Sequence, residues 1–285
     1  FDCEQYGSYD DVINNENIDA VYISTPVGNH ERWVLKAAEA GKHILCEKSS
    51  TTSFNSAKKM VETSKKNNVR LMEGFMFRFH PSHEKVRKCI NDNMIGDGFL
   101  ISSRYGFPPI SKDNIRYDKS LGGGILNDAG CYPVNASRML FQSEPNGVFC
   151  KLIMDKDTQV DTKAVLLMDF NSNIQAQCSV GYDLDYQSNY RLWGSNGSLN
   201  LTRSYNIPPD MSAKLNVKNS DVEEEIMIEP VNHFKLMIES FCEEIMKSNS
   251  YNYNFEEDLL NQARVMEACR ISNNEKRYVE IKEIK

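Results

Sequence analysis

The first hundred residues alternate between short apolar runs and stretches with helical spacing. Three nearly continuous apolar runs, "IDAVYIST" (18–25), "HILCEK" (43–48) and "VRLMEGFMF" (69–77), predict buried strands. Two intervening stretches, "HERWVLKAAEAGK" (30–42) and "SFNSAKKMVETSKKNN" (53–68), place apolar residues on one helical face, and serines and threonines are available to cap the second. The predicted order is β-α-β-α-β, which is typical of a parallel sheet covered by helices.

Polar residues follow each of these predicted strands. They are "STPVGNH" (24–30), "EKSS" (47–50) and "FRFHP" (77–81). With right-handed crossovers the three strands run the same way, so we expect these ends to share one edge of the sheet. Open α/β sheets bind their ligands at that edge.

The pattern changes after about residue 98. Short strands separated by turns are predicted at 99–107, 148–155, 162–170, 173–183 and 190–202. Such hairpin-linked strands favour an antiparallel sheet. Two amphipathic helices (232–248 and 256–272) and a short strand (278–281) complete the chain. We therefore predict an α/β protein with a partial Rossmann-type parallel sheet domain (1–98) followed by an α+β domain with an open, largely antiparallel sheet (99–285).

Composition narrows the class of protein. The chain has 285 residues and a net charge of -7, with 40 acidic and 33 basic residues and no basic block, which argues against a nucleic-acid partner. No apolar run is long enough to cross a membrane and no signal peptide is recognisable, so a cytoplasmic protein is expected. The eight cysteines form no cluster at metal-ligand spacing, so we expect reduced thiols and no metal.

A glycine-rich segment, "GGGILNDAGCYPVNASR" (122–138), carries the first candidate chemistry. An apolar helix after the glycines would place Asp128 and Tyr132 one turn apart on one face, with Asn135 on roughly the same side. An acid and a phenol so placed could act together on one substrate hydroxyl. Local hydrogen bonding of Asp128 and simple packing of Tyr132 would explain the same residues without any function.

The ligand edge carries further candidates. Lys48 follows an apolar run directly, and partial desolvation there would lower its pKa and suit it to proton transfer, although such a lysine can also simply extend to water. Thr25 and Pro26 form a polar turn before a helix, which suits an anion or a ribose. His30 opens that helix, as a cap or as a catalytic group, and Arg78 ends the third strand.

The combination and order of these blocks resemble the Gfo/Idh/MocA family, named after glucose-fructose oxidoreductase and inositol dehydrogenase. The blocks are "AVYISTPVGNH", "AGKHILCEKS", "EGFMFRFHP" and "GGGILNDAGCYPVNASRMLF", and the resemblance runs from Tyr6 to Ile281. The third block and Tyr132 look closest to the branch of dimeric dihydrodiol dehydrogenase and NADP-dependent xylose dehydrogenase. The family pairs a Rossmann domain with a domain built on an open, largely antiparallel sheet.

The resemblance implies roles for individual residues. Lys48 matches the lysine of the family's E-K-P motif beside the nicotinamide, Tyr132 matches the acid/base position, and Asp128 matches the aspartate before it. The cofactor would be lined by Ser24, Thr25, Pro26, His30, Glu47, Lys48 and Arg78. Arg116 and Asn135 would contact the substrate. The implied cofactor is NADP or NAD, with NADP favoured by the branch, and the implied assembly is a homodimer.

Three departures from the family pattern stand out. Ser49 replaces the proline that follows the lysine, which removes a rigid turn. Tyrosine in place of histidine at 132 raises the reference pKa of the acid/base group from about 6.5 to about 10, so a positive charge, which Lys48 could supply, is needed nearby. The G-x-G-x-x-G turn that cradles the pyrophosphate has no counterpart, and we expect that a segment upstream of Phe1 is missing.

The expected function is hydride transfer between a nicotinamide and a hydroxyl-bearing carbon of a sugar or cyclic diol. A non-catalytic binding or regulatory protein with a degenerate dinucleotide site remains open, because the glycine turn is missing and the motif reads E-K-S. A redox-assisted glycosidase of the same family is the other alternative.

Overall fold

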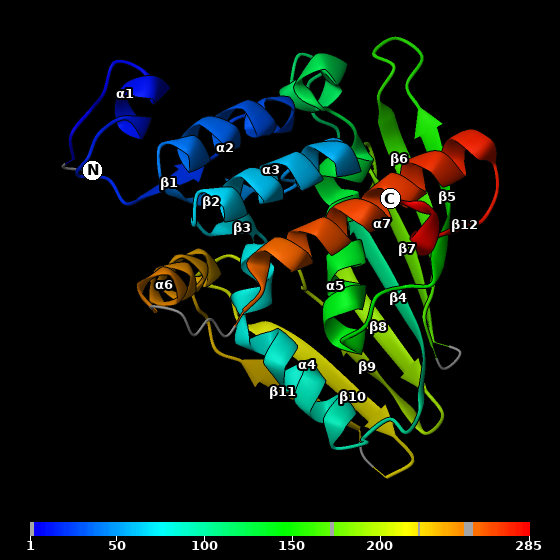
Figure 1. Cartoon of the computed structure of the whole chain (residues 1–285). Coiled ribbons are helices and arrows are strands. Elements are labelled where there is room, and N and C mark those ends of the chain that lie inside the picture. The colour runs from blue at the N-terminus through cyan, green and yellow to red at the C-terminus, as the bar shows by residue number, and fades with distance from the viewer. Residues whose placement is uncertain (1–2, 172–173, 222, 248–252) are drawn as a thin grey trace.

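The computed structural model describes residues 3–171, 174–221, 223–247 and 253–285. Its N-terminal part, blue to cyan in Figure 1, contains a parallel sheet with the strand order β1-β2-β3. The elements follow a short helix, α1 (Tyr9–Ile13), and alternate as predicted: β1 (Ala20–Ile23), α2 (His30–Glu39), β2 (His43–Glu47), α3 (Phe54–Lys66) and β3 (Leu71–Gly74).

Local interactions explain where these elements begin and end. The Ser53 hydroxyl oxygen accepts the backbone N–H of Ser56 at 3.2 Å and caps the start of α3, as the sequence predicts. Lys65 and Lys66 lie in its last turn, where positive charge is favourable to the helix dipole. The centre of β2 is buried, as expected for a strand covered on both faces.

The register of the first sheet aligns the ends of its strands. Ile23 pairs with Cys46, and Cys46 pairs with Glu73, in parallel. The three strands therefore end at one edge, and the polar segments that follow them leave from that edge, as predicted.

A second, larger sheet follows, in the order β11-β10-β9-β8-β4-β7-β6-β5-β12. Its strands are β4 (Gly98–Gly106), β5 (Gly147–Met154), β6 (Asp161–Asp169), β7 (Gln175–Gly181), β8 (Gln187–Gly194), β9 (Gly197–Leu201), β10 (Ala213–Asn219), β11 (Glu223–Ile228) and β12 (Val279–Glu280). Among the described strands, β4 and β7 form the one parallel pair of this sheet, so the predicted largely antiparallel sheet is confirmed. Residues 173 and 248, at the ends of a predicted strand and a predicted helix, lie outside the described residues.

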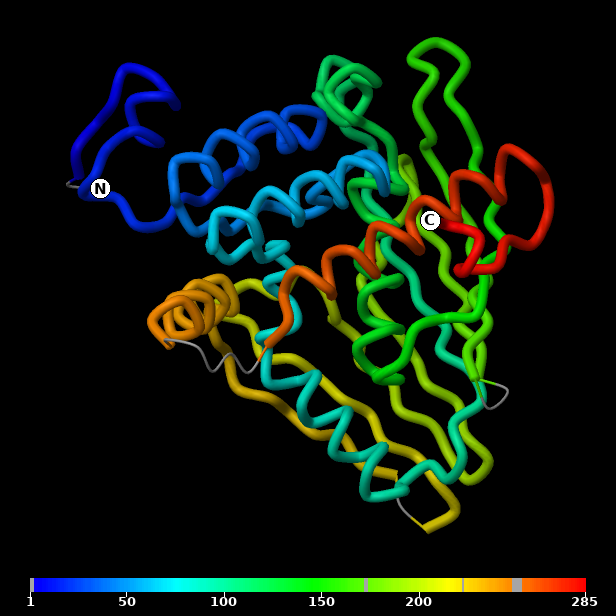
Figure 2. Tube along the Cα trace, viewed as in Figure 1, coloured from blue at the N-terminus to red at the C-terminus, as the bar shows by residue number. Residues whose placement is uncertain are grey.

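Four helices accompany the second sheet: α4 (Pro81–Asn91), α5 (Cys131–Phe141), α6 (His233–Met246) and α7 (Phe255–Glu275). Helix α7 packs against α3 and β3 of the first sheet and against β5 of the second. Its course across the molecule, orange to red, is visible in Figure 2. Helix α7 thus connects the two sheets and holds the ligand edge against the turn that precedes α5.

The segment before α5 differs from its prediction. Leu126–Gly130 forms a π-helical turn, and the α-helix begins only at Cys131. A π-helix has hydrogen bonds from residue i to i+5, and residues four apart remain roughly on one side of it. The α-helix thus begins later than expected, and Lys48 Nζ lies near both residues, 3.3 Å from Asp128 Oδ1 and 4.9 Å from the centre of the Tyr132 ring.

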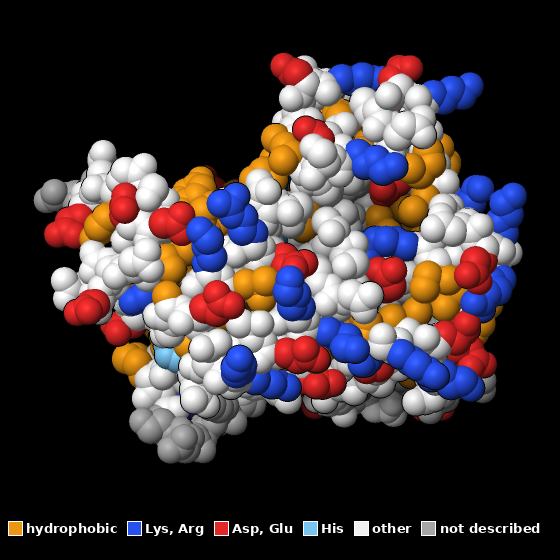
Figure 3. All heavy atoms as spheres, turned by 45° about the horizontal axis from the view of Figure 1, so that its top comes forward, with side chains coloured by type: hydrophobic (Ala, Val, Ile, Leu, Met, Phe, Trp, Pro, Cys, Tyr) orange, Lys and Arg blue, Asp and Glu red, His pale blue; other side chains and the backbone are white. Residues whose placement is uncertain are grey.

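The surface of the described part carries charges of both signs. Figure 3 shows basic and acidic side chains interspersed on the face turned toward the viewer. Within the described residues, no helix combines the length and the apolar character needed to span a membrane.

Candidate active site

A cavity of about 220 Å³ lies at the ligand edge of the first sheet, where β1 and β2 end. The glycine turn 122–124 and the segment before α5 form its opposite wall. Most of the predicted site residues line it: Ser24, Thr25, Pro26, His30, Glu47, Lys48, Arg116 and Asp128. The fold thus assembles one polar site from segments about 80 residues apart.

Lys48 points across the cavity to the segment before α5. Its Nζ donates to the backbone oxygen of Asp128 at 2.6 Å and lies 3.3 Å from Oδ1 of the same residue. Burial, the largest single effect, would lower the pKa of Lys48, but Asp128 and the other acidic groups nearby together outweigh it and the pKa is raised. The sequence-based expectation of a lowered pKa was wrong, because it left out these acidic groups.

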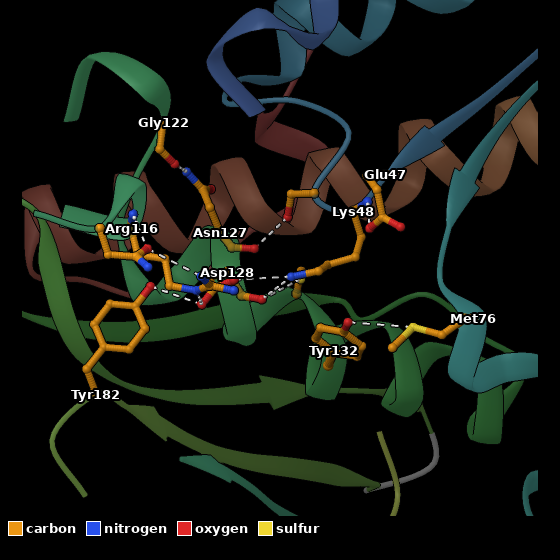
Figure 4. A network of polar contacts seen from close by, with 12 residues as sticks. Glu47, Lys48, Met76, Arg116, Gly122, Asn127, Asp128, Tyr132 and Tyr182 are labelled. Carbon is orange, nitrogen blue, oxygen red and sulfur yellow. Dashed lines mark hydrogen bonds and ion pairs between the residues drawn. The ribbon is translucent and has the colours of Figure 1, made fainter. Parts of the chain in front are cut away.

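Asp128 is the centre of the polar network shown in Figure 4. Besides Lys48, Arg116 Nε donates to its Oδ2 at 2.7 Å and the Tyr182 hydroxyl donates to Oδ2 at 3.2 Å. Burial alone would raise the pKa of Asp128, but Lys48 and Arg116 hold it below its ordinary value. Asp128 is therefore a carboxylate at neutral pH.

Tyr182 was missed by the sequence reasoning. It directly follows β7, but no local motif marks it. Its contact with Asp128 depends on the position of β7 in the second sheet, which the hydrophobic pattern does not reveal. Only the tertiary structure identifies Tyr182 as part of the network.

Tyr132 lies beneath Lys48 rather than in the cavity wall. Lys48 Nζ is 4.9 Å from the centre of the Tyr132 ring, and the hydroxyl points to Met76 Sδ at 3.7 Å (Figure 4). The side chain is 4% exposed and packs among other aromatic rings, and burial raises its pKa well above the ordinary value. Lys48 therefore contacts the ring face of Tyr132, not its hydroxyl.

His30 ties together the two segments that follow β1 and β2. Its Nδ1 lies 3.1 Å from the Ser49 backbone oxygen, and its Nε2 lies 2.6 Å from that of Thr25. Burial lowers the pKa of His30, so the ring is neutral at pH 7. A neutral imidazole has one N–H, so it donates to one of these two carbonyl oxygens, and the buried ring acts here as a structural link between the two segments.

Two predicted site residues lie elsewhere. Arg78 lines a different cavity and pairs with Asp258 of α7. Asn135 is buried, and its Nδ2 donates to Gln262 Oε1 at 3.3 Å. The structure therefore does not bring Arg78 or Asn135 to the cavity of Lys48 and Asp128.

Comparisons with known proteins agree with this architecture. Residues 1–75 match the family described as "Oxidoreductase family, NAD-binding Rossmann fold", and residues 83–200 match the "GFO/IDH/MocA C-terminal domain". The first match covers the parallel sheet β1–β3, and the second covers most of the larger sheet, from β4 to β9.

Similar individual proteins include sugar and diol dehydrogenases. D-xylose 1-dehydrogenase (NADP(+)) 2 of Haloferax volcanii is 32% identical over 238 residues, 83% of this chain and 73% of that protein. Trans-1,2-dihydrobenzene-1,2-diol dehydrogenase of Xenopus tropicalis is 32% identical over 207 residues, 72% of this chain and 60% of that protein. Both represent the branch that the sequence predicts.

A solved structure of a 3-ketoreductase from Actinomadura kijaniata, in complex with NADP and TDP-benzene, has the same fold. Its TM-score is 0.89 at 28% identity, and the match covers 93% of this chain and 81% of that one. These matches, on top of the observed fold, show that the chain belongs to the Gfo/Idh/MocA family of NAD(P)-binding oxidoreductases.

Proposed function

We propose that this protein transfers a hydride between NADP and a hydroxyl- or keto-bearing carbon of a sugar or cyclic diol, with Lys48, Asp128 and Tyr132 as its catalytic residues. The observation that carries the proposal is the Lys48 ammonium fixed on Asp128 in the wall of a cavity at the ligand edge. A fixed positive charge in a partly desolvated site stabilises the negative oxygen that develops as a carbonyl is reduced.

The residues at the ligand edge fit a nicotinamide dinucleotide. Thr25 Oγ1 is buried and has no hydrogen-bond partner among the described residues, as expected of a group that serves a ligand. Thr25 also lines the cavity beside Ser24 and Pro26. The bound dinucleotide would supply or accept the hydride. NADP is favoured because the solved ketoreductase holds NADP and the xylose dehydrogenase is named for NADP(+).

The chain's own groups have distinct parts in the reaction. Lys48 and Tyr132 both have raised pKa values, so both hold their protons at neutral pH, which suits the reduction direction. Lys48 stabilises the developing alkoxide. Tyr132 holds the acid/base position that the family resemblance implies, and its hydroxyl, directed at Met76 Sδ in this structure, must turn toward the cavity to donate the proton. Asp128 orients Lys48, and Arg116, half exposed at the cavity, contacts the substrate.

A relative supports the pairing of Lys48 with Tyr132. The Actinomadura ketoreductase has also been solved with a single lysine replaced and with a single tyrosine replaced. The same number of residues separates that lysine from that tyrosine as separates Lys48 from Tyr132.

A substrate panel tests the proposal. The complete protein encoded by the gene is assayed for NADPH oxidation and NADP⁺ reduction with a free aldose, a trans-dihydrodiol and a dTDP-keto-sugar. We expect turnover of at least one compound and, for Lys48→Met, a loss of kcat of about 100-fold or more.

Lys36→Met is the matched control, because Lys36 pairs with Asp10 at the surface of α2. Its kcat should equal that of the wild type. Cofactor turnover with none of the compounds, or equal kcat for Lys48→Met and the wild type, would contradict the proposal.

We also propose that the protein is a homodimer that pairs through one face of the second sheet. Phe149 and Leu167 are cross-strand neighbours on this face, and they are 44% and 48% exposed. Val165 and Trp193 lie on the same face and are also about half exposed. Exposed apolar area of this kind marks an interaction surface.

Light scattering coupled to size exclusion tests the dimer. The wild type should elute with twice the mass of one chain. Phe149→Glu with Leu167→Glu should elute as a monomer with an unchanged circular dichroism spectrum. A monomeric wild type would rule the dimer out.

A further inference from the structure

The loop that follows β2, residues 48–51, carries Lys48 into the cavity and is held by contacts from several elements. The Ser49 hydroxyl donates to the backbone oxygen of Asn127 at 2.9 Å. The Ser49 backbone oxygen accepts from His30 if the ring proton is on Nδ1, 3.1 Å away. Ser49 is therefore fixed against both α2 and the turn before α5. We call residues 48–51 the lysine loop.

The next contact of the lysine loop comes from β3. The backbone N–H of Ser50 donates to Oε1 of Glu73 at 2.7 Å. Glu73 can reach Ser50 because it pairs with Cys46, so its side chain stands beside the point where β2 ends. Ser50 is 1% exposed, which keeps water from replacing the carboxylate. A hydrogen bond to a charged acceptor in such a place is stronger than a neutral one.

Glu73 also faces a second cavity, of about 230 Å³, on the side away from the lysine loop. Polar and apolar side chains from several elements line it, and the charged residues among them besides Glu73 are Arg78, Arg87 and Asp258. The mechanism proposed above uses none of these residues. Glu73 thus lines this cavity and also holds the lysine loop through Ser50.

We propose that Glu73 is a positioning residue for Lys48: by accepting the Ser50 N–H it fixes the lysine loop, and with it the ammonium that meets Asp128. The proposal rests on the proposed function, since it takes Lys48 as the group that meets the substrate. Glu73 itself touches neither Lys48 nor Asp128 in any recorded contact among the described residues, so it acts through the backbone.

The charge of Glu73 changes near neutral pH. Burial raises the pKa of Glu73 to about 7, against the opposing effect of the Ser50 hydrogen bond. Of the other groups that face it, Asp258 raises the pKa further and Arg138 lowers it, and Arg78 and Arg87 stand across the cavity. Against the effect of burial, Arg78 and Arg138 lower the pKa of Asp258, so Asp258 already carries its charge where Glu73 titrates.

Two substitutions of Glu73 distinguish a role in positioning Lys48 from a role in the stability of the fold alone. Glu73→Gln keeps an acceptor oxygen for Ser50 at every pH, whereas Glu73→Leu removes it. We expect kcat of the wild type to rise with pH through about 7, as Glu73 ionises. Glu73→Gln, the neutral counterpart of the protonated acid, should lack this acid limb and keep at all pH values the kcat that the wild type has below pH 7. Glu73→Leu, which has no acceptor, should lose about 10- to 100-fold in kcat at all pH values with little change in KM.

Hydrogen exchange of the Ser50 amide provides a readout that does not need activity. Exchange should be slow in the wild type and in Glu73→Gln, and at least 10-fold faster in Glu73→Leu. If the wild type turns over no sugar or diol, the proposed function fails, but the Ser50 amide still decides the role of Glu73 in fixing the loop.

Glu267 offers a matched control. Its Oε2 accepts the backbone N–H of Phe54 at 3.3 Å, just beyond the lysine loop. Glu267→Gln and Glu267→Leu should leave both the acid limb and Ser50 exchange unchanged. The proposal is overturned if Glu73→Leu retains wild-type kcat and Ser50 protection. It is also overturned if the acid limb persists in Glu73→Gln. This second test remains valid even if the Glu73→Leu variant does not fold.

Discussion

The Lys48 side chain shows how acidic neighbours, Asp128 foremost, set the protonation of a buried group. Desolvation favours the neutral amine, and a carboxylate 3.3 Å away favours the ammonium. Desolvation is the largest single effect, but the pKa of Lys48 is raised because Asp128 acts together with other acidic groups nearby, Glu47 among them. Asp128 in turn keeps its own charge because Lys48 and Arg116 both contact it. The reactivity of Lys48 therefore depends on Asp128.

Replacing Asp128 by Asn tests this dependence. Without the carboxylate, burial dominates and the pKa of Lys48 should fall. Because Lys48 acts as an ammonium, activity should then be lost at a lower pH than in the wild type, and kcat near neutrality should drop about 10- to 100-fold. The pH dependence of kcat measures both effects.

Tyr182→Phe is the comparison for Asp128→Asn. It removes one hydrogen bond to Asp128 but leaves the charge, so a loss of only about 5-fold is expected, with no shift of the alkaline limb. A shift in Tyr182→Phe as large as in Asp128→Asn would show that hydrogen bonding, and not charge, controls Lys48.

At the scale of elements, the hydrophobic pattern predicted most of what is found. It predicted the β-α-β-α-β order, the cap at Ser53 and the shared edge. It could do so because the spacing of apolar residues along the chain reflects which side of a strand or helix is buried. It could not predict the π-helical turn 126–130, since no local signal distinguishes a π turn from an α-helix. The contact of Tyr182 with Asp128 was equally inaccessible, since it depends on strand order.

The packing of α6 on the segment before α4 leads to a pH prediction. The rings of His80 and His233 meet edge to face with their centres 5.9 Å apart, and each side chain is 1% exposed. Burial lowers the pKa of both to about 4. In the unfolded chain these histidines bind protons near pH 6.5, but in the folded protein they do so only near pH 4. The free energy of unfolding should therefore fall as the pH drops from about 6.5 to 4.

Urea unfolding at several pH values measures this loss. Each histidine contributes up to about 3 kcal/mol across the range, from about 1.4 kcal/mol per pKa unit. His233→Leu removes one of the two groups, so its stability relative to the wild type should improve as the pH falls from 7 to 4.5. A constant difference between the two proteins over that range would show that His233 does not titrate with unfolding.

At the scale of the whole molecule, the candidate site exists only where the two sheets meet. Lys48 comes from the end of the first sheet, and Asp128 and Tyr182 come from segments packed on the second. The family resemblance paired Lys48 with Asp128 correctly. Arg78 and Asn135 lie outside the cavity in this structure, and their partners, Asp258 and Gln262, belong to α7 near the end of the chain.

The central claim is that this protein moves hydride between NADPH and a substrate carbon. Its most direct test uses NADPH with deuterium at both C4 positions, a keto sugar, and mass spectrometry of the product made by the complete protein. We predict one deuterium on the new carbinol carbon, and no labelled product above background with Lys48→Met. A product without deuterium, or a cofactor that stays fully reduced while the sugar is hydrolysed, would contradict the claim.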